Sequence, residues 1–427
     1  PLYDPGDGLA SNSPCVDAGV TPDALAQYQR FGFGPLDGDG DGRAATDIGP
    51  CELPAEPSGT VYADALSTNA VFPYTNWNTA AAGLADAVAA AGDGGLVLLR
   101  EGQYLLSEEV IITNAVTVRS AGCPADTRLI GTGADRCLTV TSPHALIDGL
   151  SIEQGSADQG GGVLMAAGLI QNCLVLSNYA SASGGGIYCA SGAVVRNTTV
   201  IGNASSGDGG GLYLEQGAAA LDCTVLQNGA SGSGGGLYLE GAALVFGSLV
   251  HNNSSIDGGG LYMSASATVS RCTLRNNTAS GKGGGVYCSN GGLVSLSHVD
   301  GNRAAIGAGL YAAADSLFSG CLVISNAASS AAGGVWMGGG GEVLHLTIAE
   351  NAASNFAGGL FLDENAAVTA SIIFNNRAPV SSNHVLSGGS MTYSCAAPLA
   401  AGSGNIDADP LFQQGFRGPV RPGRKVV

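Results

Sequence analysis

Hydrophobic and polar residues recur along residues 160–376 in a pattern that repeats every 24 or 25 positions. Each repeat opens with a glycine-rich triplet, continues with an aliphatic, an aromatic and an apolar residue, and closes with asparagine. The triplets begin at Gly160, Gly184, Gly209, Gly234, Gly258, Gly283, Gly307, Ala332 and Ala357. Nine repeats of this length without helical periodicity predict a parallel β-helix with one coil per repeat.

Equivalent positions of stacked coils form columns, because paired strands lie about 4.8 Å apart. Two apolar columns, beginning at Ile187 and Cys189, share one strand face and are expected to form the core. The position between them points outward and holds Tyr188, Tyr213, Tyr238, Tyr262, Tyr287, Tyr311, Trp336 and Phe361. We expect this aromatic stripe to stack on itself or to lie under a loop. The alternative is that it binds glycan faces or another fibre.

The closing asparagines form a second polar column. They are Asn178, Asn203, Asn228, Asn253, Asn277, Asn302, Asn326, Asn351 and Asn376. We predict that their amides hydrogen-bond along the axis, and that asparagine is used here because it tolerates left-handed backbone. The glycines predict corners and close backbone approach. A phosphate-binding loop would need a helix after the glycines, and the pattern contains none.

The pattern is looser before residue 160, but it persists. Strands of earlier coils are predicted in residues 95–106, 110–122 and 145–155. Residues 78–92 contain one helical pattern, with Asn78 as its N-cap and with Leu84 and Val88 on its apolar side. We expect this helix to close the N-terminal end of the core, where strand edges would otherwise be exposed.

Composition narrows the classes of function. Glycine makes up 69 of the 427 residues, the net charge is −18 and only 12% of residues are charged. Such an acidic chain is a poor ligand for nucleic acid or anionic lipid. No apolar run approaches 18 residues, so no membrane span is predicted. The first residue is proline, from which we expect a processed chain or a fragment.

The chain has 11 cysteines. Four of them occupy one column in alternate coils, at Cys173, Cys223, Cys272 and Cys321. Two coils span roughly 9.6 Å, which is too far for a disulfide, so we expect small core residues there. Two pairs that flank loops are disulfide candidates, Cys15 with Cys51 and Cys123 with Cys137, and an extracellular setting would suit them.

An acidic loop at residues 36–47 is a candidate calcium site. Asp37, Asp39 and Asp41 take positions 1, 3 and 5 of a calcium-type loop, and a glycine follows at position 6. Position 12 is Ile48, where a bidentate Glu is expected, and Asp47 would have to substitute. The alternative is an acidic solvated turn. No other cofactor is expected.

Glu215 and Glu240 share one column on adjacent coils, beside Tyr213 and Tyr238. Two carboxylates about 5 Å apart beside aromatic rings suit a glycosidase, a lyase or a sugar-binding site. No Lys or Arg lies between Arg196 and Arg271 to receive an anionic sugar, and the five histidines form no column. The alternative is a pair of carboxylates at an exposed strand end.

Short motifs at both ends carry a family resemblance. They are SNSPCVDAG (11–19), TDIGPCE (46–52), PYTNWNTAAAGLADAVAAAGDGGLVLL (73–99) and GNIDADPLF (404–412). With the glycine–aromatic–asparagine repeats, they resemble bacterial secreted right-handed parallel β-helix proteins, including polymorphic outer-membrane-protein-like surface proteins. The resemblance implies secretion and a surface role that is usually non-enzymatic.

The order of these motifs departs from the family's pattern, because the closing motif stands at the C-terminus and its usual continuation at the N-terminus. We therefore divide the chain into four segments. They are a permuted C-terminal-cap-like segment (1–58), an N-terminal cap with the helix (59–94), the β-helix (95–412) and a basic tail (413–427). We predict that copies assemble head to tail, with residues 1–58 completing a neighbour; a fragment of a longer tandem protein is the alternative.

The expected function is a non-enzymatic extracellular structural or adhesive fibre subunit, whose partners are other copies of itself, glycans or other surface fibres. The second hypothesis is a polysaccharide-binding or polysaccharide-cleaving β-helix.

The calcium hypothesis predicts a calorimetric result. The full chain should release or absorb heat on titration with Ca²⁺, and the double substitution Asp37→Asn and Asp39→Asn should abolish it, because hard cations need those carboxylate oxygens. Glu342→Gln, outside the loop, is the matched control. Equal heats from the double variant and the parent chain would contradict the site.

Overall fold

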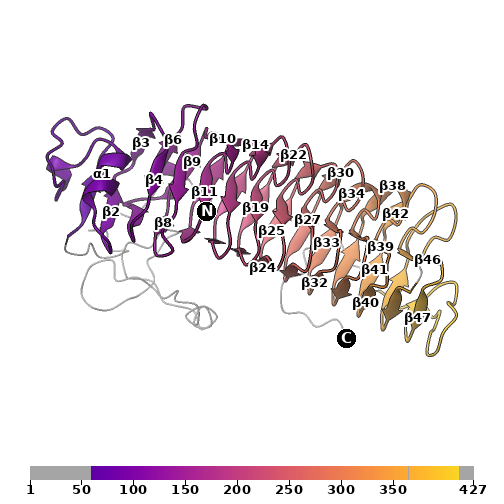
Figure 1. Cartoon of the computed structure of the whole chain (residues 1–427). Helices are drawn as coiled ribbons and strands as arrows, with labels where there is room; N and C mark the ends of the chain where they lie inside the picture. Colours follow the sequence, from indigo (N-terminus) through magenta and orange to yellow (C-terminus); the bar gives the residue numbers. More distant parts are fainter. Residues whose placement is uncertain (1–58, 364, 413–427) are drawn as a thin grey trace.

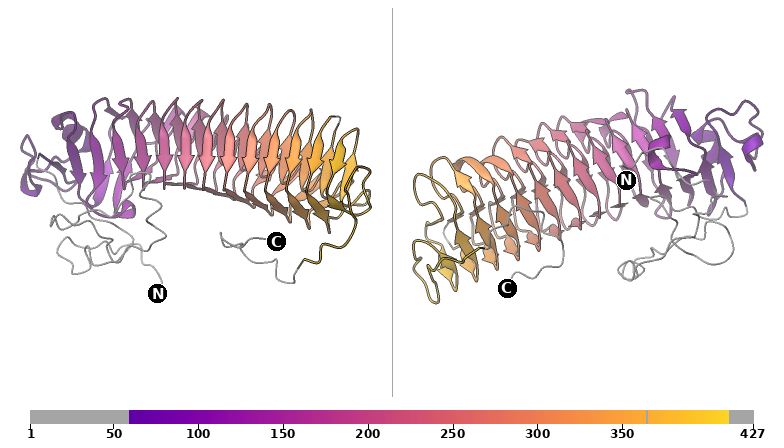
Figure 2. Two further views of the ribbon diagram at one scale, coloured as in Figure 1. Left: turned by 90° about the horizontal axis from the view of Figure 1, so that it is seen from below. Right: turned by 180° about the vertical axis from the view of Figure 1, so that it is seen from behind.

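The computed structural model describes residues 59–363 and 365–412, which form one elongated parallel β-solenoid (Figure 1). Its strands line up in four sheets that run along the rod, with 14, 13, 12 and 9 strands, and every pairing of named strands is parallel. Figure 2 shows the sheets from two further sides. The predicted all-β parallel solenoid is confirmed. Residues 1–58 and 413–427, including Cys15, Cys51 and the predicted calcium loop, lie outside the described residues.

We name the sheets by their end strands. Sheet A runs from β1 (Val61–Ala63) to β47 (Ser390–Thr392), and sheet B from β3 (Gly102–Leu105) to β48 (Cys395–Ala396). Sheet C runs from β4 (Val110–Ile112) to β46 (His384–Leu386), and sheet D from β10 (Ser156–Gln159) to β42 (Ala352–Ala353). A full coil crosses the sheets in the order C, A, B and D, and the coils at the two ends of the rod lack a strand of sheet D.

One coil illustrates the repeat. It consists of β15 (Ile187–Cys189), β16 (Val194–Arg196), β17 (Thr199–Ile201) and β18 (Ala204–Ser205). The next coil starts at β19 (Leu212–Leu214), which pairs with β15 in register, so that Tyr188 faces Tyr213. Strands this short cannot stand alone, and stacking on the neighbouring coils supplies their stability.

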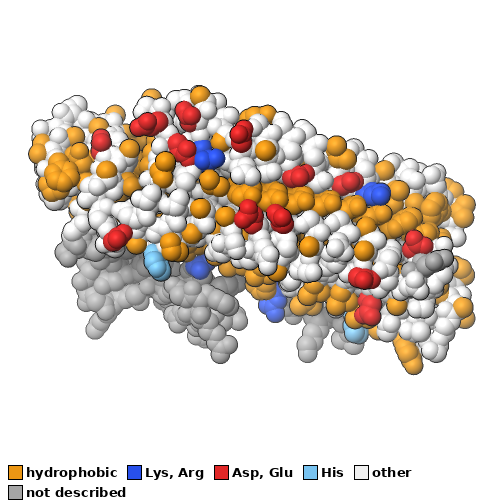
Figure 3. Space-filling view, in the orientation of Figure 1, with side chains coloured by type: hydrophobic (Ala, Val, Ile, Leu, Met, Phe, Trp, Pro, Cys, Tyr) orange, Lys and Arg blue, Asp and Glu red, His pale blue; other side chains and the backbone are white. Residues whose placement is uncertain are grey.

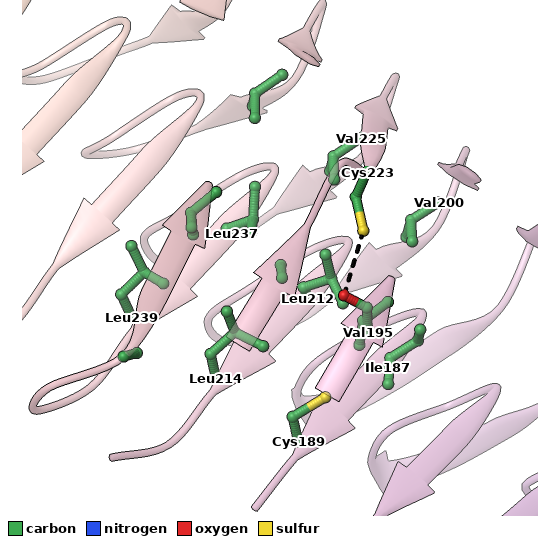
Figure 4. Close-up of a cluster of buried hydrophobic side chains, with 14 of the residues drawn as sticks. Ile187, Cys189, Val195, Val200, Leu212, Leu214, Cys223, Val225, Leu237 and Leu239 are labelled. Atoms are coloured by element: carbon green, nitrogen blue, oxygen red, sulfur yellow. Dashed lines mark hydrogen bonds between the residues drawn. The ribbon is translucent and has the colours of Figure 1, made fainter. Parts of the chain in front are cut away.

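The core is a column of aliphatic side chains inside the rod (Figure 4). Ile187 and Cys189 point inward from sheet C, and Val195 and Val200 point inward from sheets A and B. All four are fully buried. Burying an aliphatic side chain of this size contributes about 1.5–3 kcal/mol, so each coil adds several such contributions. The two predicted core columns are confirmed.

The glycine triplets form the corner before sheet C. Gly234 has φ +67°, a left-handed conformation, and a Cβ on Gly235 would lie 2.4 Å from the carbonyl oxygen of Ser254. Corners and close backbone approach are thus both present. Ala332 and Ala357 take the first position of the triplet in later coils, also with positive φ, so alanine is accepted there with some strain.

The asparagine column forms a continuous amide ladder at the corner between sheets B and D. Each Nδ2 donates to the Oδ1 of the next rung at 2.9–3.1 Å, and the nine asparagines are at most 5% exposed. In addition, the backbone N–H of Asn253 donates to Asn277 Oδ1, and its Nδ2 donates to the carbonyl of Val225. The predicted ladder is confirmed.

Two details of the ladder differ from the prediction. The left-handed residue is the one before each rung, such as Asn252 (φ +56°), and not the rung itself, which needs its side chain turned inward. The ladder also has a further rung, because Asn376 donates to Asn383 Oδ1. Asn383 stands where the preceding coil has Gly359, whose Cβ would lie 2.5 Å from the Asn376 amide. In the last coil, the side chain of Asn383 therefore occupies the ladder position that the asparagine of a following coil would take.

The N-terminal helix is shorter than predicted. α1 spans Leu84–Ala90 and begins after Gly83, while Asn78 lies in the 3-10 turn η2 (Trp77–Thr79), which Asn76 caps. The helix cannot begin at Asn78, because the backbone between η2 and α1 is not helical at Ala80 or Gly83. In that stretch Ala81 also forms a parallel bridge with Ala63 of sheet A.

Leu84 and Val88 are buried as predicted, and α1 contacts β1, β2 (Leu96–Leu99) and β4 at the N-terminal end of the rod. Its role as a plug stays a prediction. Because β1 already belongs to sheet A, the sheets begin before residue 95, inside the segment assigned as a cap.

The cysteines behave mostly as small core residues. Cys173, Cys223, Cys272 and Cys321 are buried free thiols, as expected. The predicted bond between Cys123 and Cys137 is wrong, because Cys137 is a free thiol whose Sγ faces the core and donates to the Glu153 carbonyl at 3.4 Å. The helix found in residues 59–412 falls short of the length and apolarity of a membrane span.

The ladder predicts that Asn253→Ala destabilises the rod by about 2–4 kcal/mol, because it leaves the backbone N–H of Asn228 and one of its two amide hydrogens without an acceptor in a buried place. Urea-induced unfolding followed by circular dichroism measures the change. Asn355→Ala, at an exposed asparagine outside the ladder, is the matched control. Equal unfolding midpoints for the two variants would contradict the ladder's role.

Candidate functional site: an aromatic stripe bordered by carboxylates

The aromatic stripe lies on the outer face of sheet C, and Figure 3 shows it as a hydrophobic band along the rod. In-register pairing places each ring one strand spacing from the next. The five successive tyrosine pairs from Tyr188 to Tyr311 have ring centroids 4.8–5.0 Å apart and interplanar angles of 4–11°. Trp336 and Phe361 continue the stack, with centroids 3.9 Å apart.

Stacking covers the faces of the rings. Tyr188 and Tyr311 are only 8% exposed, and the rings between them are half-buried. A sugar that stacks on an aromatic residue needs an open face, whereas this stripe presents mainly ring edges and hydroxyls. The self-stacking expected from the sequence is present. Glycan binding through ring faces is the disfavoured alternative and stays a prediction.

Glu215 and Glu240 border the stripe on the side where the strands of sheet C end. The hydroxyl of Tyr188 donates to Glu215 Oε1 at 2.5 Å, and that of Tyr213 donates to Glu240 Oε2 at 2.8 Å. Each tyrosine therefore binds a carboxylate on the next coil. Burial of the ring, and then this bond to Glu215, raises the pKa of Tyr188; burial and the bond to Glu240 raise the pKa of Tyr213.

The contacts of Glu215 and Glu240 give both carboxylates the same partner. Each accepts a tyrosine hydroxyl from the stripe, although Glu215 is half-buried and Glu240 is exposed. Glycoside hydrolysis needs two carboxyl groups in environments that separate their roles, one as the acid and one as the base or nucleophile. The catalytic alternative for this pair stays a prediction.

A second acidic border lies on the opposite side of the stripe, in the column that precedes the glycine triplets. Asp208 and Asp257 stand there, and each accepts a backbone N–H from the next coil at 2.7 Å, from Ser233 and Lys282 respectively. Lys282 belongs to the same column, and its Nζ lies 5.0 Å from the ring centroid of Tyr311. Sequence reasoning missed this border. Its signal was the charged residue just before the triplets in SGDGGG, SIDGGG and SGKGGG.

Within residues 59–363 and 365–412, no group of three or more His, Cys, Asp and Glu side chains could hold a metal ion. The thiols are also poor ligands, because burial raises the pKa of Cys223 and of Cys272 to about 12 and of Cys321 to about 11. The calcium prediction at Asp37, Asp39, Asp41 and Asp47 lies outside the described residues and stays a prediction.

A surface depression of about 340 Å³ lies elsewhere, over the turns between sheets C and A. Among its lining residues Arg196 is charged and none is acidic, and the rest are small or aliphatic. It does not include Glu215 or Glu240.

Comparisons with known proteins found one family model and several distant structures. A family model described as "Periplasmic copper-binding protein (NosD)" matches residues 146–317, less than half of the chain. No curated protein matches. Among solved structures, the chain resembles the Agl-KA catalytic domain at 14% identity, covering 81% of this chain and 70% of that chain, with a TM-score of 0.49.

It also resembles a PL6 alginate lyase in complex with a trisaccharide, at 12% identity, 80% and 86% coverage and a TM-score of 0.44. A third similar structure is pectate lyase Pel9A, at 12% identity, 80% and 81% coverage and a TM-score of 0.35. Likenesses this distant carry no argument about this chain. The resemblance to polymorphic outer-membrane-protein-like proteins is not confirmed by these matches.

The stripe predicts that some of its tyrosines ionise at a higher pH than tyrosines of an unfolded chain. Burial, and then the neighbouring tyrosines, raise the pKa of Tyr287 to about 12, against about 10 in an unfolded chain. The protonated ring is thus favoured in the folded state, so its stabilising contribution is complete below about pH 10 and is lost as pH rises through about 12.

Absorbance at 295 nm against pH measures this titration in the folded chain and in guanidinium. Tyr287→Phe should remove one late-titrating group. A folded chain in which all thirteen tyrosines ionise together near pH 10 would contradict the stacked stripe.

Proposed function

We propose that this chain is a non-enzymatic structural or adhesive protein that works outside the cytoplasm and joins with copies of itself end to end. The observation that carries the proposal is the placement of exposed apolar side chains. Ten of the fourteen exposed large hydrophobic side chains of the described part lie in its two end regions, residues 59–112 and 380–411. The long middle of the rod has the other four.

The apolar side chains at both ends are large and well exposed. At the N-terminal end Leu66 is 83% exposed and Leu105 is 77% exposed. At the C-terminal end Tyr393 is 67% exposed and Leu411 is 79% exposed. Exposed apolar patches are costly in water unless another surface covers them, and different patches at the two ends would join copies head to tail.

Such a contact would involve side chains more than strand pairing. Helix α1 packs beside β1 and β4 at one end. At the other end Ile406 bridges to Cys395, and Asn405 Oδ1 accepts the N–H of Ser394, so a loop occupies the edge of sheet B. Ends covered in this way avoid uncontrolled edge-to-edge aggregation and leave the apolar side chains to select the partner.

The description of the matched family as periplasmic supports a place outside the cytoplasm. Its copper-binding description does not carry over. The described residues contain no group of donors that suits a metal, and the cysteines in the matched region are buried with raised thiol pKa values, for example Cys223. We therefore assign no copper chemistry to this chain.

Sedimentation velocity and negative-stain electron microscopy of the purified full chain test the proposal. We expect rods that lengthen with protein concentration, in steps of one solenoid. Leu66→Asp at one end or Leu399→Asp at the other should shift the assembly to single rods, because a charge would have to be buried in the contact.

Leu296→Asp is the matched control, since Leu296 is exposed to nearly the same extent as Leu399 (59% against 56%) but lies in the middle of the rod. A parent chain that stays a monodisperse monomer at high concentration would overturn the proposal. An equal effect of Leu296→Asp would also overturn it.

A further inference from the structure

We propose that the aromatic stripe and its two acidic borders are the docking site for the chain's own basic C-terminal segment, residues 413–427. The stripe is the outer face of sheet C, and no described element covers it (Figure 3). This inference is independent of end-to-end assembly, because it concerns the side of the rod and is expected in a single copy.

Charge is the first argument. Asp208 and Asp257 stand on one border, and Glu215 and Glu240 stand on the other, over β19, β23 (Leu237–Leu239) and β27 (Leu261–Met263). Each carboxylate already holds one donor, and each has a second oxygen or further lone pairs for another. Within the described residues of these two columns, Lys282 is the single cation, so the site has an excess of negative charge.

The segment has the complementary charge. Residues 413–427 contain Arg417, Arg421, Arg424 and Lys425, and no acidic residue follows Asp409. These four cations complement the four carboxylates over β19 to β27, and a fifth carboxylate, Asp363, lies farther along the column of Glu215 and Glu240. Pro419 and Pro422 disfavour helix, so the segment suits an extended binding mode along a straight stripe.

The structure contains an example of the contact that we propose. Lys282 places its Nζ 5.0 Å from the ring centroid of Tyr311, while its backbone N–H donates to Asp257. A cation in the border column therefore lies against the ring stack, while the Asp257 carboxylate binds the lysine backbone and not its ammonium. Arginine and lysine side chains of an incoming segment would lay their apolar stems along the ring edges at other coils and place their charged ends on the border carboxylates.

The segment is long enough to cover the axial distance to the nearer end of the site, and the remaining length must take it round the rod from sheet B, where Ile406 bridges to Cys395, to sheet C. From β46 to β27 sheet C has five strand spacings, or about 24 Å. Arg421 and Arg424 lie nine and twelve residues beyond Phe412, and an extended chain covers about 3.3 Å per residue, so they reach about 30 and 40 Å. A tethered segment also has an effective concentration in the millimolar range, which favours docking within one chain.

Zero-length carbodiimide crosslinking of the full chain, followed by peptide mass spectrometry, tests the docking. The chain has only two lysines, Lys282 and Lys425, so the origin of each amide crosslink is unambiguous. We expect the links of Lys425 to fall on Asp208, Glu215, Glu240 or Asp257, and to decrease at least fivefold in 0.5 M NaCl.

The triple substitution Arg417→Glu, Arg421→Glu and Arg424→Glu keeps Lys425 but should abolish those links. Arg303→Glu, on sheet D, is the matched control and should leave them unchanged. Circular dichroism of each variant confirms that the solenoid is intact before the links are compared.

A mixture of ¹⁴N- and ¹⁵N-labelled chains separates docking within one chain from docking between chains. Same-label links support the proposal, and links found mainly between labels would overturn it. Links of Lys425 spread over carboxylates outside the two borders would overturn it as well, as would links that the triple substitution does not reduce.

Discussion

The constraint on which the whole molecule depends is that each coil lies in register on the next, one strand spacing away. Every side chain therefore has the equivalent side chain of two neighbouring coils about 4.8 Å from it. Only a few residue types gain from such a neighbour. Asparagine is both donor and acceptor, so its amides join into a ladder from Asn178 to Asn383. Aromatic rings stack, and aliphatic side chains pack on copies of themselves.

Charge is the residue property that this geometry tolerates least, because like charges one spacing apart repel each other. The chain accordingly has few charged residues. Where carboxylates share a border column of the stripe, either a neutral residue separates them or a hydrogen-bond donor binds each of them. Glu215 and Glu240 are adjacent, and each accepts a tyrosine hydroxyl. Asp208 and Asp257 are separated by Ser233 in their column. The acidic borders that we assign to docking therefore lie at positions where a tyrosine hydroxyl or an intervening serine reduces the repulsion between the carboxylates.

Much of the fold could be predicted from the sequence, because a repeat of 24 or 25 residues states which positions are neighbours. The core columns, the aromatic stripe and the amide ladder all followed from that. The failures lie where the repeat gives no information. Asn383 is seven residues from Asn376 and could not be placed by spacing, and the start of α1 depends on the bridge between Ala81 and Ala63. The pairing of Cys123 with Cys137 assumed that a loop brings them together, whereas Cys137 faces the core. The Asp208 border was missed because one charged position recurs in too few coils to show as a column.

Native-state hydrogen exchange measured by mass spectrometry tests most directly whether the coils are coupled along the axis. If the ladder and stripe join the coils, amides across residues 178–376 should open together, with one shared and highest free energy of exchange. The two end regions, 59–112 and 380–412, should open at lower free energies. Central coils that exchange one by one with graded free energies, or as fast as the ends, would contradict the claim that side-chain ladders make the rod a single cooperative unit.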